Sequence, residues 1–185
     1  GFQGLVADGA HVGEISTIAT VKGSAKSILT GERTALNFLQ RLSGTATLTA
    51  QFVATTAQYD VKIIDTRKTT AGWRAIQKYA VHAGGGHNHR FGLYDGVLIK
   101  DNHIIAAGSI SQAIEKVKST VPHTMKIEIE VETLDQVEEA LHAGADILLL
   151  DNMPVNFMKQ AVKKIAGRAV VEASGGITLD QVEAV

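Results

Sequence analysis

Short apolar segments alternate with helical patterns along residues 96–173. The apolar segments are rich in β-branched residues and are followed by turn residues, which predicts buried strands. They lie at residues 96–100, 126–132, 146–150 and 169–173, with one more upstream at 61–65. Strand–helix alternation at this spacing predicts parallel βαβ units, and continuous apolar strands suit a sheet covered on both faces. The chain is therefore expected to be an α/β protein.

The segments between these strands place apolar residues on one helix face, at residues 109–120, 134–143 and 156–166. Residues 32–59 also form a helical pattern, with a break or kink expected at Ser43-Gly44. The hexapeptide at 133–138 (TLDQVE) recurs at 178–183, and each copy has the Thr-x-x-Gln spacing of a capping box. We expect each copy to begin a helix, and the repetition favours a barrel of similar βα units.

A barrel of this kind takes about 250 residues, and five recognisable strands in 185 residues fall short of it. The first residue is glycine, and only seven residues follow Thr178. We therefore expect an open, TIM-like parallel barrel that is truncated at both ends.

The composition excludes several classes of protein. Apolar residues make up 45% and charged residues 20%, which suits a globular core and not a disordered chain. The chain has no cysteine, which rules out disulfides and zinc–thiolate sites. A net charge of −1 argues against nucleic-acid binding by a broad basic surface. No apolar run reaches membrane-span length and no leader is visible, so a cytoplasmic location is expected.

The charges fall into two blocks of opposite sign. Residues 67–100 hold six Lys or Arg and one Asp, a net +5, whereas residues 127–158 hold eight Asp or Glu and no Lys or Arg, a net −8. Two solvated surfaces are the simplest interpretation. However, many of these charges directly follow predicted strands, and the chemistry of βα barrels lies at the carboxyl ends of the strands.

The basic residues at strand ends are Arg67, Lys68, Arg90 and Lys100. Cations that are held close together repel one another, so an anion is expected to complete the site. Arginine matches carboxylates with its planar fork, which indicates a small ligand with several carboxylates or phosphates. The loop at 84–86 (GGG) could bring backbone close to that ligand, or could be a plain flexible turn. The His87-x-His89 pair lacks a third ligand with metal-site spacing.

The acidic residues Glu128, Glu130 and Glu132 alternate, so they share one face of their strand. Asp151, at the end of the next strand, can lie beside Glu130 or Glu132, and such a pair suits Mg²⁺ with a phosphorylated substrate. Pairing with the neighbouring basic residues is the alternative.

The glycine-rich turn Ser174-Gly175-Gly176 precedes the helix expected at Thr178, and backbone N–H groups at a helix N-terminus bind phosphate. No Ser–His–Asp arrangement or cysteine nucleophile is present, so the predicted chemistry relies on positioning and charge stabilisation.

These motifs in combination resemble the quinolinate phosphoribosyltransferase family. The segments that carry the resemblance cover most of the chain: 31–37 (GERTALN), 42–47 (LSGTAT), 65–70 (DTRKTT), 77–81 (QKYAV), 84–93, 98–103 (LIKDNH), 128–131, 149–152 (LLDN) and 172–176 (EASGG).

The resemblance implies an open α/β barrel at 26–185 that lacks its last strand, preceded at 1–25 by the remnant of an N-terminal α/β sandwich domain. It also implies a homodimer or higher homo-oligomer. The implied enzyme uses Mg²⁺ to combine quinolinate with phosphoribosyl pyrophosphate, which gives nicotinate mononucleotide, pyrophosphate and CO₂. A fragment of such an enzyme is expected to be inactive.

The resemblance also implies roles for single residues. The dicarboxylate would be bound by Arg67, Lys68, His89, Arg90 and Lys100, and the partner subunit's site would be reached by Arg33. Glu130 and Asp151 would serve the Mg²⁺–ribose region and, together with Lys68, catalysis. Ser174, Gly175 and Gly176 would contact a phosphate.

Two alternatives stay open at this point. One is a related phosphoribosyltransferase on the same scaffold, of the nicotinate type or associated with molybdate-transport genes. The dicarboxylate cluster argues against a monocarboxylate substrate. The other is a non-catalytic, ligand-binding barrel, against which the intact motif residues argue.

Overall fold

The computed structural model describes residues 1–185, which divide into two units, 1–91 and 92–185. The elements of the first unit are β1 (Phe2–Gly4), β2 (Ala19–Val21), α1 (Ala25–Thr55) and α2 (Arg74–Ala83). The elements of the second are β3 (Val97–Ile99), α3 (Asp101–Ala107), α4 (Ile110–Lys118), β4 (Ile127–Val131), α5 (Leu134–Ala143), β5 (Ile147–Asp151), α6 (Val155–Ile165) and β6 (Val170–Ser174).

Helix α1 runs unbroken through Ser43 and Gly44, so the break expected there is wrong. Gly31 and Gly44 both lie inside α1, and each interior glycine costs a helix about 1 kcal/mol relative to alanine. The 31 residues of α1 include many good helix formers, which offset that cost.

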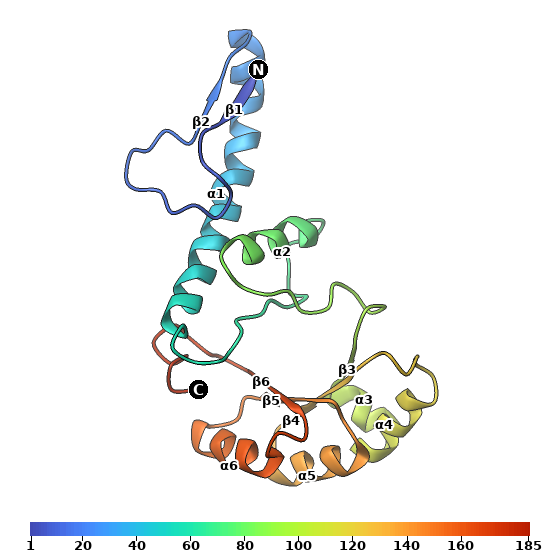
Figure 1. Ribbon diagram of the computed structural model, residues 1–185. Helices are drawn as coiled ribbons and strands as arrows, with labels where there is room; N and C mark the ends of the chain where they lie inside the picture. Colours follow the sequence, from blue (N-terminus) through green and yellow to red (C-terminus); the bar gives the residue numbers. More distant parts are fainter. The chain divides into compact units, whose positions relative to one another are not determined.

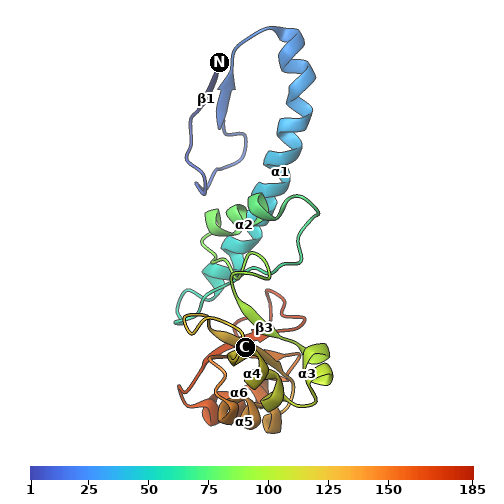
Figure 2. The same ribbon diagram turned by 90° about the vertical axis from the view of Figure 1, so that its right-hand side faces the viewer.

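Helix α2 packs against the middle of α1, as Figures 1 and 2 show from two directions. At the start of α2, the ring of Trp73 stacks on Phe38 of α1 with 4.6 Å between the centroids. At its end, a Cβ on Gly84 would lie 2.3 Å from the carbonyl oxygen of Ala46. Stacking at one end and a close backbone approach at the other therefore fix α2 on α1.

The strand expected at residues 61–65 is wrong, because only Ile64 forms a β-bridge, with His87. His87 donates its N–H to the Ile63 carbonyl (2.8 Å), and Asp65 donates its own to the His87 carbonyl (3.1 Å). A single bridge does not make a strand ladder. The bridge nevertheless places the start of 65–70 beside the start of 87–91.

Strands β3–β4–β5–β6 form one parallel sheet in sequence order, which confirms the other four predicted strands and the α/β class. Helices α4, α5 and α6 cover one face of this sheet (Figure 1). That face is apolar and buried, and its central residues include Ile129, Val131, Leu148 and Leu150.

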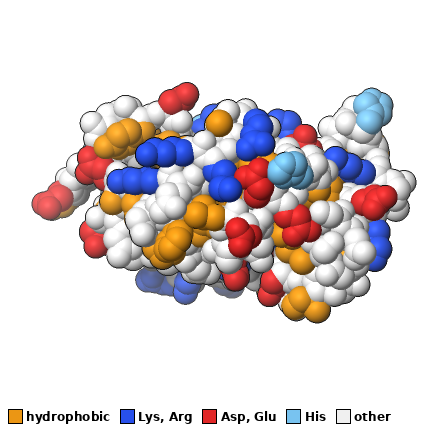
Figure 3. Space-filling view, turned by 90° about the horizontal axis from the view of Figure 1, so that it is seen from below, with side chains coloured by type: hydrophobic (Ala, Val, Ile, Leu, Met, Phe, Trp, Pro, Cys, Tyr) orange, Lys and Arg blue, Asp and Glu red, His pale blue; other side chains and the backbone are white.

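Local signals position the helices of the second unit. The hydroxyl of Ser109 accepts from the N–H of Gln112 (3.2 Å) and begins α4. Thr133 forms a capping box with Gln136 at the start of α5, and Gly144 ends α5 in the left-handed region with φ 77°. The outer side of these helices, seen from below in Figure 3, carries Lys/Arg and Asp/Glu side chains of both signs with scattered apolar groups.

The helix expected to begin at Thr178 is not formed, because residues 179–184 are turns. Gln181 and Val182 donate to the Thr178 carbonyl (3.0 Å each), but the ladder does not continue. The Gln181 N–H thus bonds to the Thr178 carbonyl, whereas a capping box would direct it to the Thr178 hydroxyl. The helix-dipole part of the predicted phosphate site is therefore wrong.

None of the helices is both long enough and apolar enough to cross a membrane.

Candidate active site

The sheet of the second unit has one polar face. Its register pairs Glu130 with Leu149 and Asp151 with Ser174, and paired residues of a parallel sheet point to the same side. Because side chains alternate along a strand, this register places five polar residues on the same face of the sheet: Glu128, Glu130, Asp151, Glu172 and Ser174. The predicted common face for Glu128 and Glu130 is thereby confirmed.

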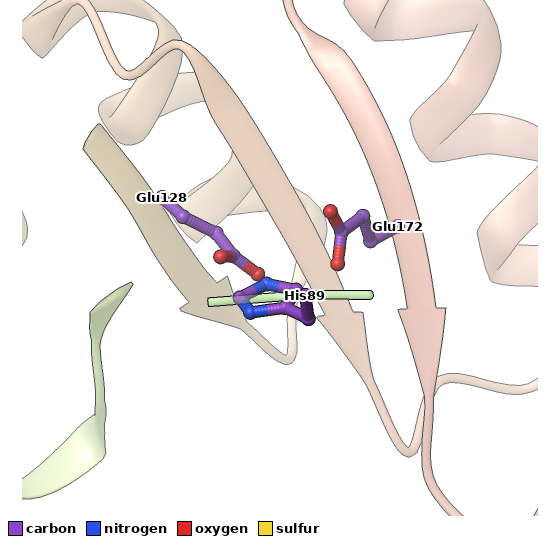
Figure 4. Close-up of side chains that lie close together, drawn as sticks. All are labelled: His89, Glu128 and Glu172. Atoms are coloured by element: carbon purple, nitrogen blue, oxygen red, sulfur yellow. The ribbon is translucent and has the colours of Figure 1, made fainter. Parts of the chain in front are cut away.

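Two acidic residues lie at the centre of this polar face. Figure 4 shows Glu128 on β4 and Glu172 on β6 with their side chains directed toward each other, on either side of β5. Their carboxylate oxygens lie within 4.8 Å of each other, and the Glu128 side chain is buried. Carboxylates this close repel each other unless positive charge balances them. The sequence prediction did not single out Glu172, although its alternation with Ser174 could have indicated it.

Lys100 and Glu130 form an ion pair between the carboxyl ends of β3 and β4. Lys100 precedes α3 directly, and its backbone N–H donates to Nδ1 of His103 (2.9 Å). The Glu130 side chain is 15% exposed and that of Lys100 45% exposed. The structure thus brings two predicted site residues together, one from the basic block and one from the acidic block.

Asp151 and Ser174 meet at the carboxyl ends of β5 and β6. The Ser174 hydroxyl donates to Oδ1 of Asp151 (2.5 Å), and Nδ2 of Asn152 donates to Oδ2 (2.8 Å). Gly175 follows with φ +98°, and a Cβ there would lie 2.2 Å from Oδ1 of Asn152. Gly175 is therefore required for this close approach, whereas nothing lies within 4 Å of a Cβ on Gly176.

In the first unit, Asp65 joins the two segments that carry the predicted cations. Its Oδ1 accepts from the backbone N–H of His89 (2.8 Å), and its Oδ2 accepts from Nδ2 of Asn88 (2.6 Å). Lys78, on α2, forms a buried ion pair with Asp65 and donates to the His89 carbonyl (2.9 Å). Asp65 thus links the start of residues 65–70 with residues 88–91.

The predicted cations lie on either side of this junction. Arg67 is half-buried, and its Nε is buried without a hydrogen-bond partner. Lys68 is exposed. His89 and Arg90 are half-buried, and the Arg90 N–H donates to Nδ1 of His89 (2.8 Å). The arrangement suits an anionic ligand, because a buried guanidinium N–H without a partner is costly until an acceptor binds.

The glycines at 84–86 serve packing. A Cβ on Gly86 would lie 2.7 Å from Cγ2 of Thr49 and 2.8 Å from Cγ1 of Val81. A Cβ on Gly84 would lie closer still, 2.3 Å from the Ala46 carbonyl oxygen, so this turn is a tight joint against α1 and its interpretation as a flexible turn is wrong. The turn also fixes the start of the segment that carries His89 and Arg90.

Arg33 lies on α1 and is exposed. The sequence prediction gave no site role to Asp65, Arg74, Lys78 or Asn88. The four-residue spacing of Arg74 and Lys78 indicates that they share one helix face, but not what they contact. The ligand-binding and catalytic roles assigned to the site residues stay predictions.

The fold and these strand ends define the class: an α/β protein of parallel βα units with charged and glycine-rich groups at the carboxyl edge of its sheet. Two family profiles match the chain, "Quinolinate phosphoribosyl transferase, C-terminal domain" over residues 45–185 and the N-terminal domain of the same name over residues 2–43. The chain therefore belongs to the quinolinate phosphoribosyl transferase family, which confirms the resemblance. The domain boundary expected at residue 25 stays a prediction.

Similar proteins carry consistent names. The "Probable nicotinate-nucleotide pyrophosphorylase [carboxylating]" of Bacillus subtilis (strain 168) is 50% identical over 174 residues, which are 94% of this chain and 60% of that protein. The protein of the same name from Synechocystis is 45% identical over 187 residues, covering 100% of this chain and 63% of that protein. The solved nicotinate-nucleotide pyrophosphorylase of Francisella tularensis is 44% identical, covers 100% of this chain and 65% of its own, and has a TM-score of 0.95. The chain thus spans less than two thirds of these proteins.

Proposed function

We propose that the complete protein transfers the phosphoribosyl group of phosphoribosyl pyrophosphate to quinolinate and decarboxylates the product to nicotinate mononucleotide. The observation that carries the proposal is the Asp65 junction, because it fixes the segments of Arg67, Lys68, His89 and Arg90 beside each other. Such a concentration of cationic and imidazole groups suits a dicarboxylate better than a monocarboxylate.

The reaction begins when the cations bind both carboxylates and orient the pyridine ring. The ring nitrogen forms a bond to C1′ of the ribose as the bond from C1′ to the pyrophosphate oxygen breaks, and pyrophosphate leaves with the electron pair. Positive charge develops at C1′, and the carboxylates of Glu130 and Asp151 stabilise it. Lys100 keeps Glu130 oriented through their ion pair.

Decarboxylation follows because the ring nitrogen has become cationic. The bond between ring C2 and its carboxylate carbon breaks, CO₂ leaves, and the electron pair stays on C2 beside the positive nitrogen. C2 then takes a proton from solvent. Lys68 is the exposed cation of this group, and its positive charge attracts and positions the substrate carboxylate.

Glu130 and Asp151 fit Mg²⁺ by the chemistry of their donors. Both present hard carboxylate oxygens from neighbouring strand ends, and Mg²⁺ in phosphate-handling sites is bound by one or two carboxylates plus substrate oxygens. Bound there, Mg²⁺ would neutralise pyrophosphate charge. Ser174, Gly175 and Gly176 would contact a phosphate of the same substrate.

The test uses the full-length protein with Mg²⁺, phosphoribosyl pyrophosphate and either quinolinate or nicotinate. Release of CO₂ and formation of nicotinate mononucleotide from quinolinate are the expected results. Turnover of nicotinate alone would instead assign a nicotinate-type phosphoribosyltransferase. Quinolinate binding without turnover would indicate a binding protein.

A cytoplasmic homodimer, in which Arg33 reaches the partner's site, completes the proposal. Arg33 is exposed on α1 and available to a partner. Sedimentation analysis, together with activity in mixtures of Arg33→Ala and Asp151→Asn subunits at a Mg²⁺ concentration too low to support Asp151→Asn alone, tests this part. Partial recovery of activity in the mixture is expected, since a site with both residues intact forms only across two chains.

A further inference from the structure

We infer that α2 is a positioning element for the quinolinate-binding cations, through Arg74, Gln77 and Lys78. This inference rests on the proposed function. The three side chains have i, i+3 and i+4 spacing, so they lie on one face of α2. Each bonds to residues 65–70 or to residues 88–91, the two segments that carry Arg67, Lys68, His89 and Arg90.

Lys78 makes the most deeply buried of these contacts. Its side chain is 5% exposed and that of its partner Asp65 is 8% exposed. The Lys78 ammonium also donates to the His89 carbonyl, and the Lys78 carbonyl accepts from Nδ2 of Asn88 (2.9 Å each). Burying an ion pair carries a large desolvation cost, so such pairs are weak contributors to stability. What this pair does supply is a fixed geometry for the backbone of His89.

Arg74 bridges the same two segments one turn earlier. Its guanidinium donates to the carbonyl of Phe91 (3.1 Å), the carbonyl of Arg67 (3.4 Å) and the hydroxyl of Thr69 (3.3 Å). The planar fork of arginine makes these bonds in one orientation, which lysine cannot reproduce. Arg74 thereby holds the backbone of Phe91, which follows Arg90, beside the backbone of Arg67.

Gln77 is the third side chain of this face of α2, and it bonds to Thr70. Its Oε1 accepts from the Thr70 N–H (2.8 Å), and its Nε2 donates to the Thr70 hydroxyl (3.2 Å). Lys78 and Arg74 are thus both engaged with the protein itself and are positioning residues, not ligands of the substrate. Because α2 is fixed on α1 at Trp73 and Gly84, the two cation-bearing segments take their position from α1.

The test measures binding of quinolinate and of phosphoribosyl pyrophosphate to the full-length protein by calorimetry. Lys78→Met keeps the length of the side chain and removes its charge. We expect quinolinate affinity to fall about tenfold or more, since a small misplacement of binding groups is costly, with phosphoribosyl pyrophosphate affinity changed less than about twofold. Lys164→Met is the matched control, because Lys164 pairs with Glu138 on the surface, and both affinities should stay as in the unaltered protein.

Arg74→Lys is the second variant and decides the question if Lys78→Met does not fold. It keeps the charge and loses the fork, and we expect the same selective loss of quinolinate affinity. Unchanged quinolinate affinity in folded variants, or an equal loss for both ligands, would overturn the inference. If the unaltered protein itself fails to bind quinolinate, the proposed function is rejected first and the inference falls with it.

Discussion

The Ser174 hydroxyl donates a 2.5 Å hydrogen bond to Oδ1 of Asp151, its register partner across β5 and β6. The other oxygen of the same carboxylate accepts from Asn152. Asp151 is therefore oriented by two neutral donors. No basic side chain pairs with Asp151, whereas Glu130 pairs with Lys100.

Asp151→Asn should raise the Mg²⁺ concentration needed for half-maximal activity about tenfold, since the proposed Mg²⁺ site would lose one anionic oxygen ligand. Quinolinate affinity should not change. The control is Asp146→Asn at the opposite end of β5, where Oδ2 accepts from the Ile127 N–H (2.8 Å) and an amide oxygen can also accept. Magnesium titrations of activity on the full-length protein make the measurement. An unchanged Mg²⁺ dependence in Asp151→Asn would show that this carboxylate is structural.

Arg90→Ala should weaken quinolinate binding about 10- to 100-fold, because a charge-assisted bond to a carboxylate contributes about 1.5–3 kcal/mol. Arg168→Ala is the control, since Arg168 only bonds to carbonyls at the end of α6. Calorimetric titration with quinolinate measures both. Equal affinities in the unaltered protein and in Arg90→Ala would remove Arg90 from the pocket.

The sequence predicted the elements whose signals are local. Helix α5 has the predicted bounds, because Thr133 and Gly144 begin and end it. The strands of the second unit agree within two residues, because their apolar runs are bounded by turn residues. Helix α2 was missed because its first residues carry no side-chain cap, and α3 was missed because it is short and buries no residue.

The sequence also predicted which strand ends carry charge, but not the pairing of those charges. Lys100 and Glu130 are 30 residues apart and meet only because β3 and β4 are neighbours. Lys78 belongs to the same basic block as Arg67 and is nevertheless buried on Asp65. Whether a cation faces a ligand or supports the backbone depends on tertiary contacts, which spacing does not encode.

The two copies of the TLDQVE hexapeptide test whether the same sequence contributes equally to stability in two different surroundings. Thr133 caps α5, whose Val137 and Ala140 are buried, whereas the copy at 178–183 forms turns and buries no side chain. Thr133→Ala should therefore lower the free energy of unfolding by about 1 kcal/mol. Thr178→Ala should cost clearly less. Urea unfolding of both variants measures the difference, and equal losses would contradict the helix assignment.

Tyr79 offers a test by pH. Its hydroxyl donates to Oδ2 of Asp8 (2.5 Å), and this bond with the nearby negative charge raises the pKa of Tyr79 above its usual value of 10.0. A raised pKa means that the contact stabilises the fold at pH values below 10 and is lost as the pH rises through the folded-state pKa. In Asp8→Asn, the ultraviolet titration of Tyr79, identified by difference from Tyr79→Phe, should move down toward 10. A titration that stays in place would show that the contact with Asp8 does not form in solution.

Glycine-to-alanine changes at Gly84 and Gly44 should have opposite effects on stability, because Gly84 packs against α1 and Gly44 lies inside α1. In Gly84→Ala the new Cβ would lie 2.3 Å from the backbone oxygen of Ala46, so α1 and α2 must move apart. We expect a loss of about 1–3 kcal/mol in the free energy of unfolding, with weaker quinolinate binding because the His89–Arg90 segment starts at this joint. Gly44→Ala adds a Cβ with nothing within 4 Å inside a helix and should gain up to about 1 kcal/mol. Urea unfolding should show a loss of stability in Gly84→Ala and a gain in Gly44→Ala, and quinolinate titration should show weaker binding only in Gly84→Ala. A Gly84→Ala protein that is as stable and binds quinolinate as tightly as the unaltered protein would show that α2 does not rest on α1 through this contact.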